Sequence, residues 1–123
     1  MTIDTNILIA YLSGDEKVIN FLNSWRNQGG FLYLPTIVES ELLSFTGWTE
    51  KEENLVKIFL QENFISISFD RRLAEIASQL RKTKKLKLPD AAIAATAIQT
   101  KTPLVTRNIK DFKNLNQLKL IEI

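Results

Sequence analysis

Several acidic side chains in this sequence stand where a strand is predicted to end or a helix to begin. Asp4 follows the short apolar stretch 1–3, and Asp90 opens an alanine-rich run after Pro89. Carboxylate oxygens are the ligands that Mg²⁺ and Mn²⁺ prefer in proteins. Acids brought close together also repel one another, so they need a bound cation or raised pKa values. The acids therefore predict a site for a hard divalent cation.

Both aspartates also have a simpler explanation. Aspartate is a good N-cap, because its side chain accepts a hydrogen bond from an unpaired backbone N–H in the first turn of a helix. For Asp4, position alone does not separate a ligand from a cap. For Asp90, capping of the alanine-rich helix that follows is again the simpler alternative, and the two roles are compatible.

Glu41 lies in a predicted helix together with an acid of a different kind. Glu39 stands three residues after Thr36, which is the spacing of a capping box, and needs no further explanation. Glu41 lies four residues from both Ile37 and Phe45, so these residues share one helix face. A carboxylate within an apolar face must find a partner or a metal, because its unpaired burial is costly. The alternative is that Glu41 stands at the edge of this face and reaches solvent.

The segment 106–112 carries two further polar candidates, Asn108 and Asp111, just after a predicted strand. Both side chains could turn toward the carboxyl end of the sheet, where ligands of parallel sheets collect. A short polar turn would have the same composition, so this segment is weak evidence by itself.

Two residue types are missing, and their absence restricts the chemistry. The chain has no histidine and no cysteine. This excludes Ser-His-Asp and Cys-His catalysis, thiolate zinc sites and disulfides. An enzyme with this composition must work with carboxylates, lysines and cations bound through oxygen.

The net charge of +2 hides an uneven distribution. Residues 1–69 carry four basic and nine acidic side chains, whereas residues 81–113 carry nine basic side chains and only two acids. Such asymmetry is typical of a surface that contacts a polyanion. The basic run contains Lys82, Lys84, Lys85 and Lys87. Taken alone, such a run is more often a solvated helix end and loop.

Strand and helix patterns alternate along the chain. Short runs rich in β-forming residues predict strands at 31–34, 64–67, 104–106 and 118–121, with a very short first strand at 1–3. Helical spacing of apolar residues appears at 18–25 and again at 73–80, where Asp70 is a predicted N-cap. Thr49 and Glu52 form a second predicted capping box.

This alternation predicts an α/β sandwich whose strands pair in parallel. The length of 123 residues, without repeats or linkers, predicts a single domain over residues 1–123. No apolar run approaches the roughly 18 residues needed to cross a bilayer, and the first residues lack the features of a signal peptide. We therefore expect no membrane association and a cytoplasmic location.

Four segments resemble the motifs of PIN domains, particularly those of VapC-type toxins of toxin–antitoxin pairs. They are 3–9 (IDTNILI), 41–43 (ELL), 88–97 (LPDAAIAATA) and 106–112 (TRNIKDF), in family order and spread over essentially the whole chain. The sequence departs from the family where the run 84–87 (KKLK) replaces a glycine commonly found before the Pro-Asp motif.

The resemblance implies a PIN-like, Rossmann-like three-layer sandwich, with a mostly parallel central sheet flanked by helices. It implies a catalytic and metal-binding set that would hold Mg²⁺ or Mn²⁺ for the hydrolysis of RNA: Asp4, Glu41, Asp90 and Asp111. Asn108 is the alternative to Asp111 as the fourth residue. Candidates for positioning the ligands or the substrate are Thr5, Asn6, Thr106, Arg107 and Asn108. Lys82, Lys84, Lys85 and Lys87 are candidates for contacts with the RNA backbone.

The resemblance also implies partners. A VapC-like toxin is held inactive by a cognate antitoxin protein, and the family suggests a homodimer. Two alternatives are a PIN nuclease of housekeeping RNA maturation or decay, and an inactive PIN-shaped binding module. The retention of four acids argues against the inactive module, since a single substitution would abolish activity.

Overall fold

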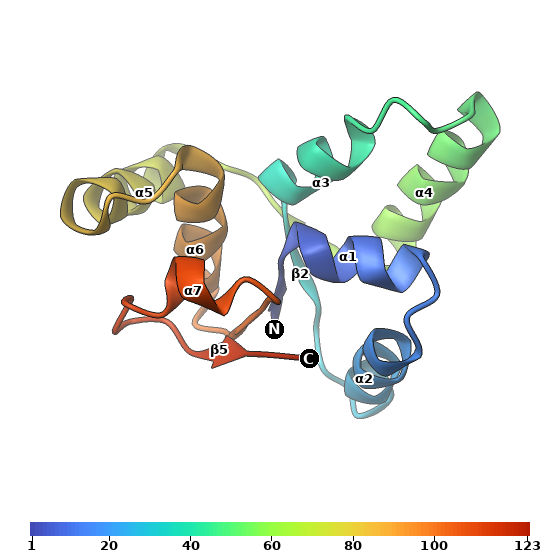
Figure 1. The fold of residues 1–123 in the computed structure, drawn as a ribbon, viewed down its shortest axis with the longest axis horizontal. Coiled ribbons are helices and arrows are strands. Elements are labelled where there is room, and N and C mark those ends of the chain that lie inside the picture. Colours follow the sequence, from blue (N-terminus) through green and yellow to red (C-terminus); the bar gives the residue numbers. More distant parts are fainter.

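Five short parallel strands form the centre of the protein. The computed structural model describes residues 1–123 (Figure 1). Its strands are β1 (Thr2–Ile3), β2 (Tyr33–Pro35), β3 (Ile65–Ile67), β4 (Leu104–Val105) and β5 (Leu120–Ile121). They pair in the order β3-β2-β1-β4-β5, and every neighbouring pair is parallel. The predicted parallel α/β architecture is confirmed.

Seven helices connect and cover these strands. They are α1 (Thr5–Leu12), α2 (Glu16–Asn27), α3 (Thr36–Leu43), α4 (Glu50–Asn63), α5 (Arg71–Lys84), α6 (Leu88–Thr100) and α7 (Ile109–Phe112). In Figure 1, helices α1 to α4 lie to the right of β1 and β2, and helices α5 to α7 lie to their left. The sheet is therefore flanked by helices on both sides. No helix combines the length and the apolar character that crossing a bilayer requires.

The order of the strands defines where a ligand site is expected. From β1 the chain moves outward in one direction through β2 and β3, and then returns to the other side of β1 for β4 and β5. Ligands of such sheets bind beyond the carboxyl ends of the strands, where the winding direction changes. That point lies between β1 and β4. Asp4 directly follows β1, and Thr106 directly follows β4.

All five predicted strands are confirmed, although each is shorter than the apolar run that predicted it. The largest difference is in β2, which begins at Tyr33 rather than at Phe31. Phe31 is exposed, and Pro35, which we expected to follow the strand, is its last residue. A proline is tolerated there because the end of a strand needs few ladder hydrogen bonds from the backbone N–H.

Two of the three predicted N-terminal caps are confirmed. The Asp70 side chain accepts a hydrogen bond from the Leu73 N–H, and Thr49 forms a reciprocal capping box with Glu52. The capping box predicted for Thr36 is wrong. Helix α3 begins at Thr36 itself, directly after Pro35, so this threonine lies inside the first turn. Its hydroxyl instead accepts a hydrogen bond from the distant Phe69 N–H at 3.1 Å.

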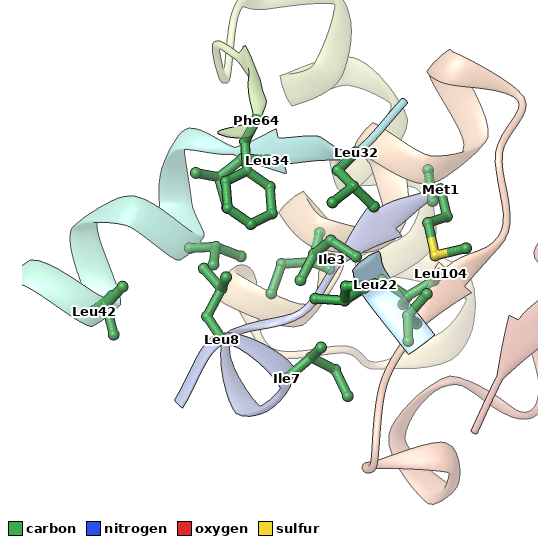
Figure 2. Close-up of a cluster of buried hydrophobic side chains, with 14 of the residues drawn as sticks. Met1, Ile3, Ile7, Leu8, Leu22, Leu32, Leu34, Leu42, Phe64 and Leu104 are labelled. Carbon is green, nitrogen blue, oxygen red and sulfur yellow. The ribbon is translucent and has the colours of Figure 1, made fainter. Parts of the chain in front are cut away.

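The core is built around α1, α6 and the central strands. Figure 2 shows Ile3, Leu34 and Leu104, from three adjacent strands, gathered with Ile7 and Leu8 of α1. Each such side chain contributes about 1.5–3 kcal/mol through burial. In α6, every residue from 91 to 97 is buried, because alanines let the helix pack closely against α5, β1 and β2. This close packing fixes the start of α6, and with it Asp90.

Candidate active site

Asp4 lies at the carboxyl end of β1 and is only 5% exposed. Its backbone occupies the N-cap position of α1, as one of the two sequence interpretations expected. One carboxylate oxygen accepts a hydrogen bond from the Thr5 N–H at 2.7 Å. The other accepts from the Asn6 amide at 2.9 Å and from the Thr106 hydroxyl at 2.6 Å. The carboxylate is therefore held in one orientation by the first two residues of α1 and by the residue that follows β4.

The residues around Asp4 form one connected network. The Thr106 hydroxyl is buried, and because it donates to Asp4 it accepts from the Asn108 N–H at 2.9 Å. The Asn6 side-chain oxygen accepts from the Arg107 N–H at 3.0 Å. Segments 4–6 and 106–108, about a hundred residues apart in sequence, thus hold each other in register.

Asp90 is the third residue of α6, so the alternative interpretation of this residue as an N-cap does not hold. The N-cap position is Lys87, which makes no side-chain cap bond. Leu88 and Pro89 occupy the first turn, and proline is favoured there because its missing N–H would be unpaired anyway. Asp90 still lies in the first turn, where the helix dipole favours a negative charge. A cap bond therefore does not account for this aspartate.

Glu41 is exposed on α3, and the expected interruption of a buried apolar face is wrong. Phe45, four residues later, is 59% exposed, so this part of the face points to solvent. The alternative interpretation, in which Glu41 reaches solvent, is what the structure shows. Its carboxylate accepts a hydrogen bond from the Thr5 hydroxyl at 3.0 Å, which ties it to the residue after Asp4.

Asp111 and Asn108 differ in how they relate to the other acids. Asp111 lies in α7 and lines a cavity of about 280 Å³ together with Asp90. Asn108 is exposed and contacts the network through its backbone N–H. Asn108 and Asp111 were the two alternatives for the fourth site residue, and Asp111 is the one that lies beside the other acids.

The pKa values of two aspartates show that the acids interact. Burial raises the pKa of Asp90 above its ordinary value, and the charges of Asp111, Asp4 and Glu41 raise it further, against the opposing effect of Lys87. Burial also raises the pKa of Asp4, with a smaller contribution from Asp111, although the hydrogen bonds from Thr106, Thr5 and Asn6 oppose the shift. Acids from four separate segments therefore share one electrostatic environment.

The carboxylate oxygens of these acids are suitable ligands for a hard divalent cation, although the acidic side chains are not clustered. No three acidic side chains lie close enough to form a ready metal cluster. A carboxylate offers about four lone-pair sites, and the hydrogen bonds to Asp4 use three of them. One remains for a ligand bond. No hydrogen bond contributes to the pKa shift of Asp90, whose oxygens are available.

Basic side chains line the cavity that contains Asp90 and Asp111. Its other lining residues include Lys84, Lys85 and Lys87, which the sequence had singled out as RNA contacts. Lys82 is exposed on α5 and does not line this cavity. Two further polar residues that were not predicted, Lys110 and Asn114, also line it. Their spacing of four residues near α7 was the available signal.

Arg107 points away from this cavity. Its guanidinium pairs with the Asp15 carboxylate at 2.7 Å and donates to the Ile123 carbonyl oxygen at 3.3 Å. The pair also lowers the pKa of Asp15. Sequence reasoning did not foresee this contact between the start of α2 and the end of the chain. The side chain of Arg107 is thus engaged in structure, while its backbone supports Asn6.

A second, apolar cavity lies beside Glu41. It has a volume of about 620 Å³, and its lining residues come from α1, α3 and the loop that follows α3. They include Ile9, Leu12, Leu42, Phe45 and Trp48, with Glu41 at its margin. The sequence placed Phe45 on an apolar helix face and did not predict this surface.

Comparison with known proteins places this arrangement in a known family. A family model for the PIN domain matches residues 1–118. A toxin–antitoxin complex from Klebsiella pneumoniae contains a chain that is 31% identical, with a TM-score of 0.80 and coverage of 99% of this chain and 98% of that one. VapBC2 from Rickettsia felis, bound to a DNA fragment of its promoter, matches at 26% identity and a TM-score of 0.85, covering 99% and 97%. FitAcB from Neisseria gonorrhoeae matches at 25% identity and a TM-score of 0.79, covering 98% and 95%. No curated protein matches the sequence.

Proposed function

Because the chain belongs to the PIN domain family, we propose that it is a VapC-type toxin, a metal-dependent endoribonuclease that a cognate antitoxin holds inactive. The similar structures from Klebsiella pneumoniae and Rickettsia felis are toxin–antitoxin proteins, which supports this assignment. PIN domains are generally nucleases. The proposed reaction is the hydrolysis of RNA phosphodiester bonds.

One observation carries the proposal of catalysis. Burial raises the pKa of Asp90, and the charges of Asp111, Asp4 and Glu41, which come from three other segments of the chain, raise it further. A fold has no structural need to gather four acids at one edge of its sheet, since their repulsion opposes folding. Sites that bind a cation or move protons are where such groupings occur.

Asp4 and Asp90 would hold Mg²⁺ or Mn²⁺, and Glu41 and Asp111 would assist directly or through water. When bound, the cation supplies an activated water and neutralises charge on the phosphate. The Asn6 amide and the Thr106 hydroxyl orient the Asp4 carboxylate, leaving one lone pair to face the ligand. Thr5 orients Glu41 through its hydroxyl. Arg107 and Asn108 support this network through their backbone N–H groups.

The lysines beside the acids are suited to the RNA backbone. Lys84, Lys85 and Lys87 line the same cavity as Asp90, so a phosphate held by them lies next to the acids. Such contacts supply affinity and dependence on salt, with little choice of sequence. Lys82, on the exposed surface of α5, would contact the RNA backbone further from the acids.

The apolar cavity is suited to the antitoxin. An exposed cavity with a predominantly apolar lining, next to a carboxylate, fits a protein segment that carries apolar side chains and one basic side chain. An arginine of the antitoxin would pair with the acids through its planar guanidinium and displace the cation. We also propose a homodimer on the basis of the family, which light scattering of the purified chain tests.

The decisive experiment measures cleavage of RNA by the purified chain. We expect activity with Mn²⁺ or Mg²⁺, none in chelator, and a loss of more than about 100-fold for Asp4→Asn and Asp90→Asn, because even outer partners of metal ligands contribute about 10–100-fold. Glu62→Gln, on the exposed surface of α4, is the matched control and should keep full activity. Full activity in chelator, or in either aspartate variant, would exclude this mechanism.

The toxin assignment has its own test. Expression of the chain without its antitoxin should arrest growth, and Asp90→Asn should relieve the arrest. Expression of active enzyme without any effect on growth, and without an inhibitory partner in pull-down experiments, would instead indicate a housekeeping nuclease.

A further inference from the structure

A second polar cavity adjoins the one that contains Asp90 and Asp111. It has a volume of about 460 Å³ and is lined by Thr83, Lys84, Lys85, Lys113, Asn114 and Asn116. Lys84, Lys85 and Asn114 line both cavities. The two cavities are therefore neighbours, and we call the outer one, a shallow hollow that is open to solvent, the lysine channel.

The walls of the lysine channel come from two distant segments. One wall is the C-terminal end of α5, where Lys85 is the C-cap. The other begins at Lys113, the C-cap of α7, and continues toward β5. Positive side chains at the ends of two helices are favoured by the helix dipoles. The channel contains three lysines and no acid, so its electrostatic character is opposite to that of the site it adjoins.

The lining of the channel determines which part of a nucleic acid it can bind. No hydrophobic residue lines it, so there is no aromatic ring on which a base could stack. Proteins that grip the bases of single strands use such rings. Lysine ammonium groups and asparagine amides instead donate hydrogen bonds to phosphate oxygens. The chemistry of the channel therefore matches the sugar-phosphate backbone.

We propose that the lysine channel binds the RNA backbone beyond the cleaved bond, so that the strand passes from the acids over Lys84 and Lys85 to Lys113. This inference rests on the proposed nuclease function. It adds Lys113, Asn114 and Asn116 as determinants of substrate binding. It also implies that an RNA too short to enter the channel is bound more weakly than a longer one.

Binding of fluorescent single-stranded RNA to the Asp90→Asn chain, in Mg²⁺, tests the proposal. With a long RNA, Lys113→Ser should weaken binding severalfold and reduce the slope of log affinity against log salt by about 0.7 for one lost phosphate contact. Lys113→Arg should preserve binding. Lys101→Ser is the matched control, because Lys101 is exposed at the opposite end of α6 from Asp90, and it should change nothing.

RNA length separates the channel from the rest of the site. A short RNA that fills only the cavity beside Asp90 should bind equally well to the chain with and without Lys113→Ser. The proposal is overturned if Lys113→Ser leaves the affinity and salt slope for long RNA unchanged, or if short and long RNA lose affinity equally. A failure of the nuclease assignment would appear separately, as absent cleavage by the unmutated chain with either RNA.

Discussion

Two cavities of opposite character are each lined by some of the candidate site acids. On one side, the apolar cavity is formed by residues of α1 and α3 and by Phe45 and Trp48, with Glu41 at its margin. On the other side, lysines and asparagines surround Asp90 and Asp111 and continue into the lysine channel. The first surface is suited to a protein partner that buries apolar side chains in it, and the second surface is suited to a polyanion. Glu41 belongs to the first surface, and Asp90 and Asp111 belong to the second.

This difference suggests how one site can serve two partners. A substrate that enters from the basic side and an inhibitor that docks on the apolar side compete only at the acids. Substitutions on one side should therefore affect one partner and spare the other.

The largest expected effect concerns the apolar cavity. Phe45→Glu places a charge in this cavity and should weaken inhibition by the antitoxin at least about 30-fold, as for a binding hot spot of about 2 kcal/mol. Cleavage of RNA should be unchanged. Phe31→Glu is the matched control, because Phe31 is 62% exposed against 59% for Phe45 but does not line the cavity. Titration of antitoxin against cleavage measures both, and equal inhibition of the two variants would assign the antitoxin to another surface.

Sequence patterns predicted the acids better than the surfaces around them. Asp4 and Asp90 were identifiable because each follows a local signal, a short strand or a proline before an alanine-rich helix. Their proximity followed from the rule that parallel strands end at one edge of a sheet. Local patterns were less reliable for helix α3. The capping box predicted at Thr36 does not form, because β2 runs directly into this helix. The helix face that contains Glu41 and Phe45 was predicted to be buried, whereas Phe45 is exposed.

The surfaces on both sides escaped prediction because each combines segments distant in sequence. Nothing in the run 82–87 indicates that Lys113 and Asn116 form the opposite wall of the channel. Helical spacing identifies apolar side chains without showing whether another element covers them. Phe45 is an apolar residue at a helix end that no other element covers.

A second prediction concerns the repulsion between the acids. Without metal, Asp90→Asn should melt at a higher temperature than the unmutated chain, because the substitution removes a charge that Asp111, Asp4 and Glu41 repel. Saturating Mg²⁺ or Mn²⁺ should stabilise the unmutated chain by about 2.7 kcal/mol at a hundred times the dissociation constant. The variant should gain much less. Thermal melts in metal and in chelator measure these differences.

The stability of the unmutated chain relative to Asp90→Asn should depend on pH. The pKa of Asp90 in the folded chain is raised above its ordinary value, so the folded state holds the proton more tightly than the unfolded state. The resulting stabilisation is complete below the ordinary pKa and is lost as the pH rises through the raised value. In chelator, the advantage of Asp90→Asn should therefore grow from about pH 4 toward pH 7. A variant that is less stable than the unmutated chain at neutral pH would show that Asp90 has a structural role.

The smallest expected effect concerns two lysines that share the same backbone conformation. Lys85 and Lys101 end α5 and α6 with φ of 56° and 54°, in the left-handed region that favours glycine. A lysine there costs roughly 1 kcal/mol relative to glycine, partly offset by the attraction of its charge to the helix dipole. Lys85→Gly and Lys101→Gly should therefore each raise the free energy of unfolding by up to about 1 kcal/mol.

Only one of the two variants should change RNA binding. Lys85 lines both the cavity beside Asp90 and the lysine channel, whereas Lys101 lies at the other end of α6. Lys85→Gly should thus become more stable and bind RNA more weakly, with a salt slope reduced by about 0.7, while Lys101→Gly gains stability alone. Chemical denaturation and RNA titration of both proteins provide the comparison. If both bind RNA as the unmutated chain does, Lys85 does not contact the strand, and the strained lysine at the end of α5 is retained for some reason other than the substrate.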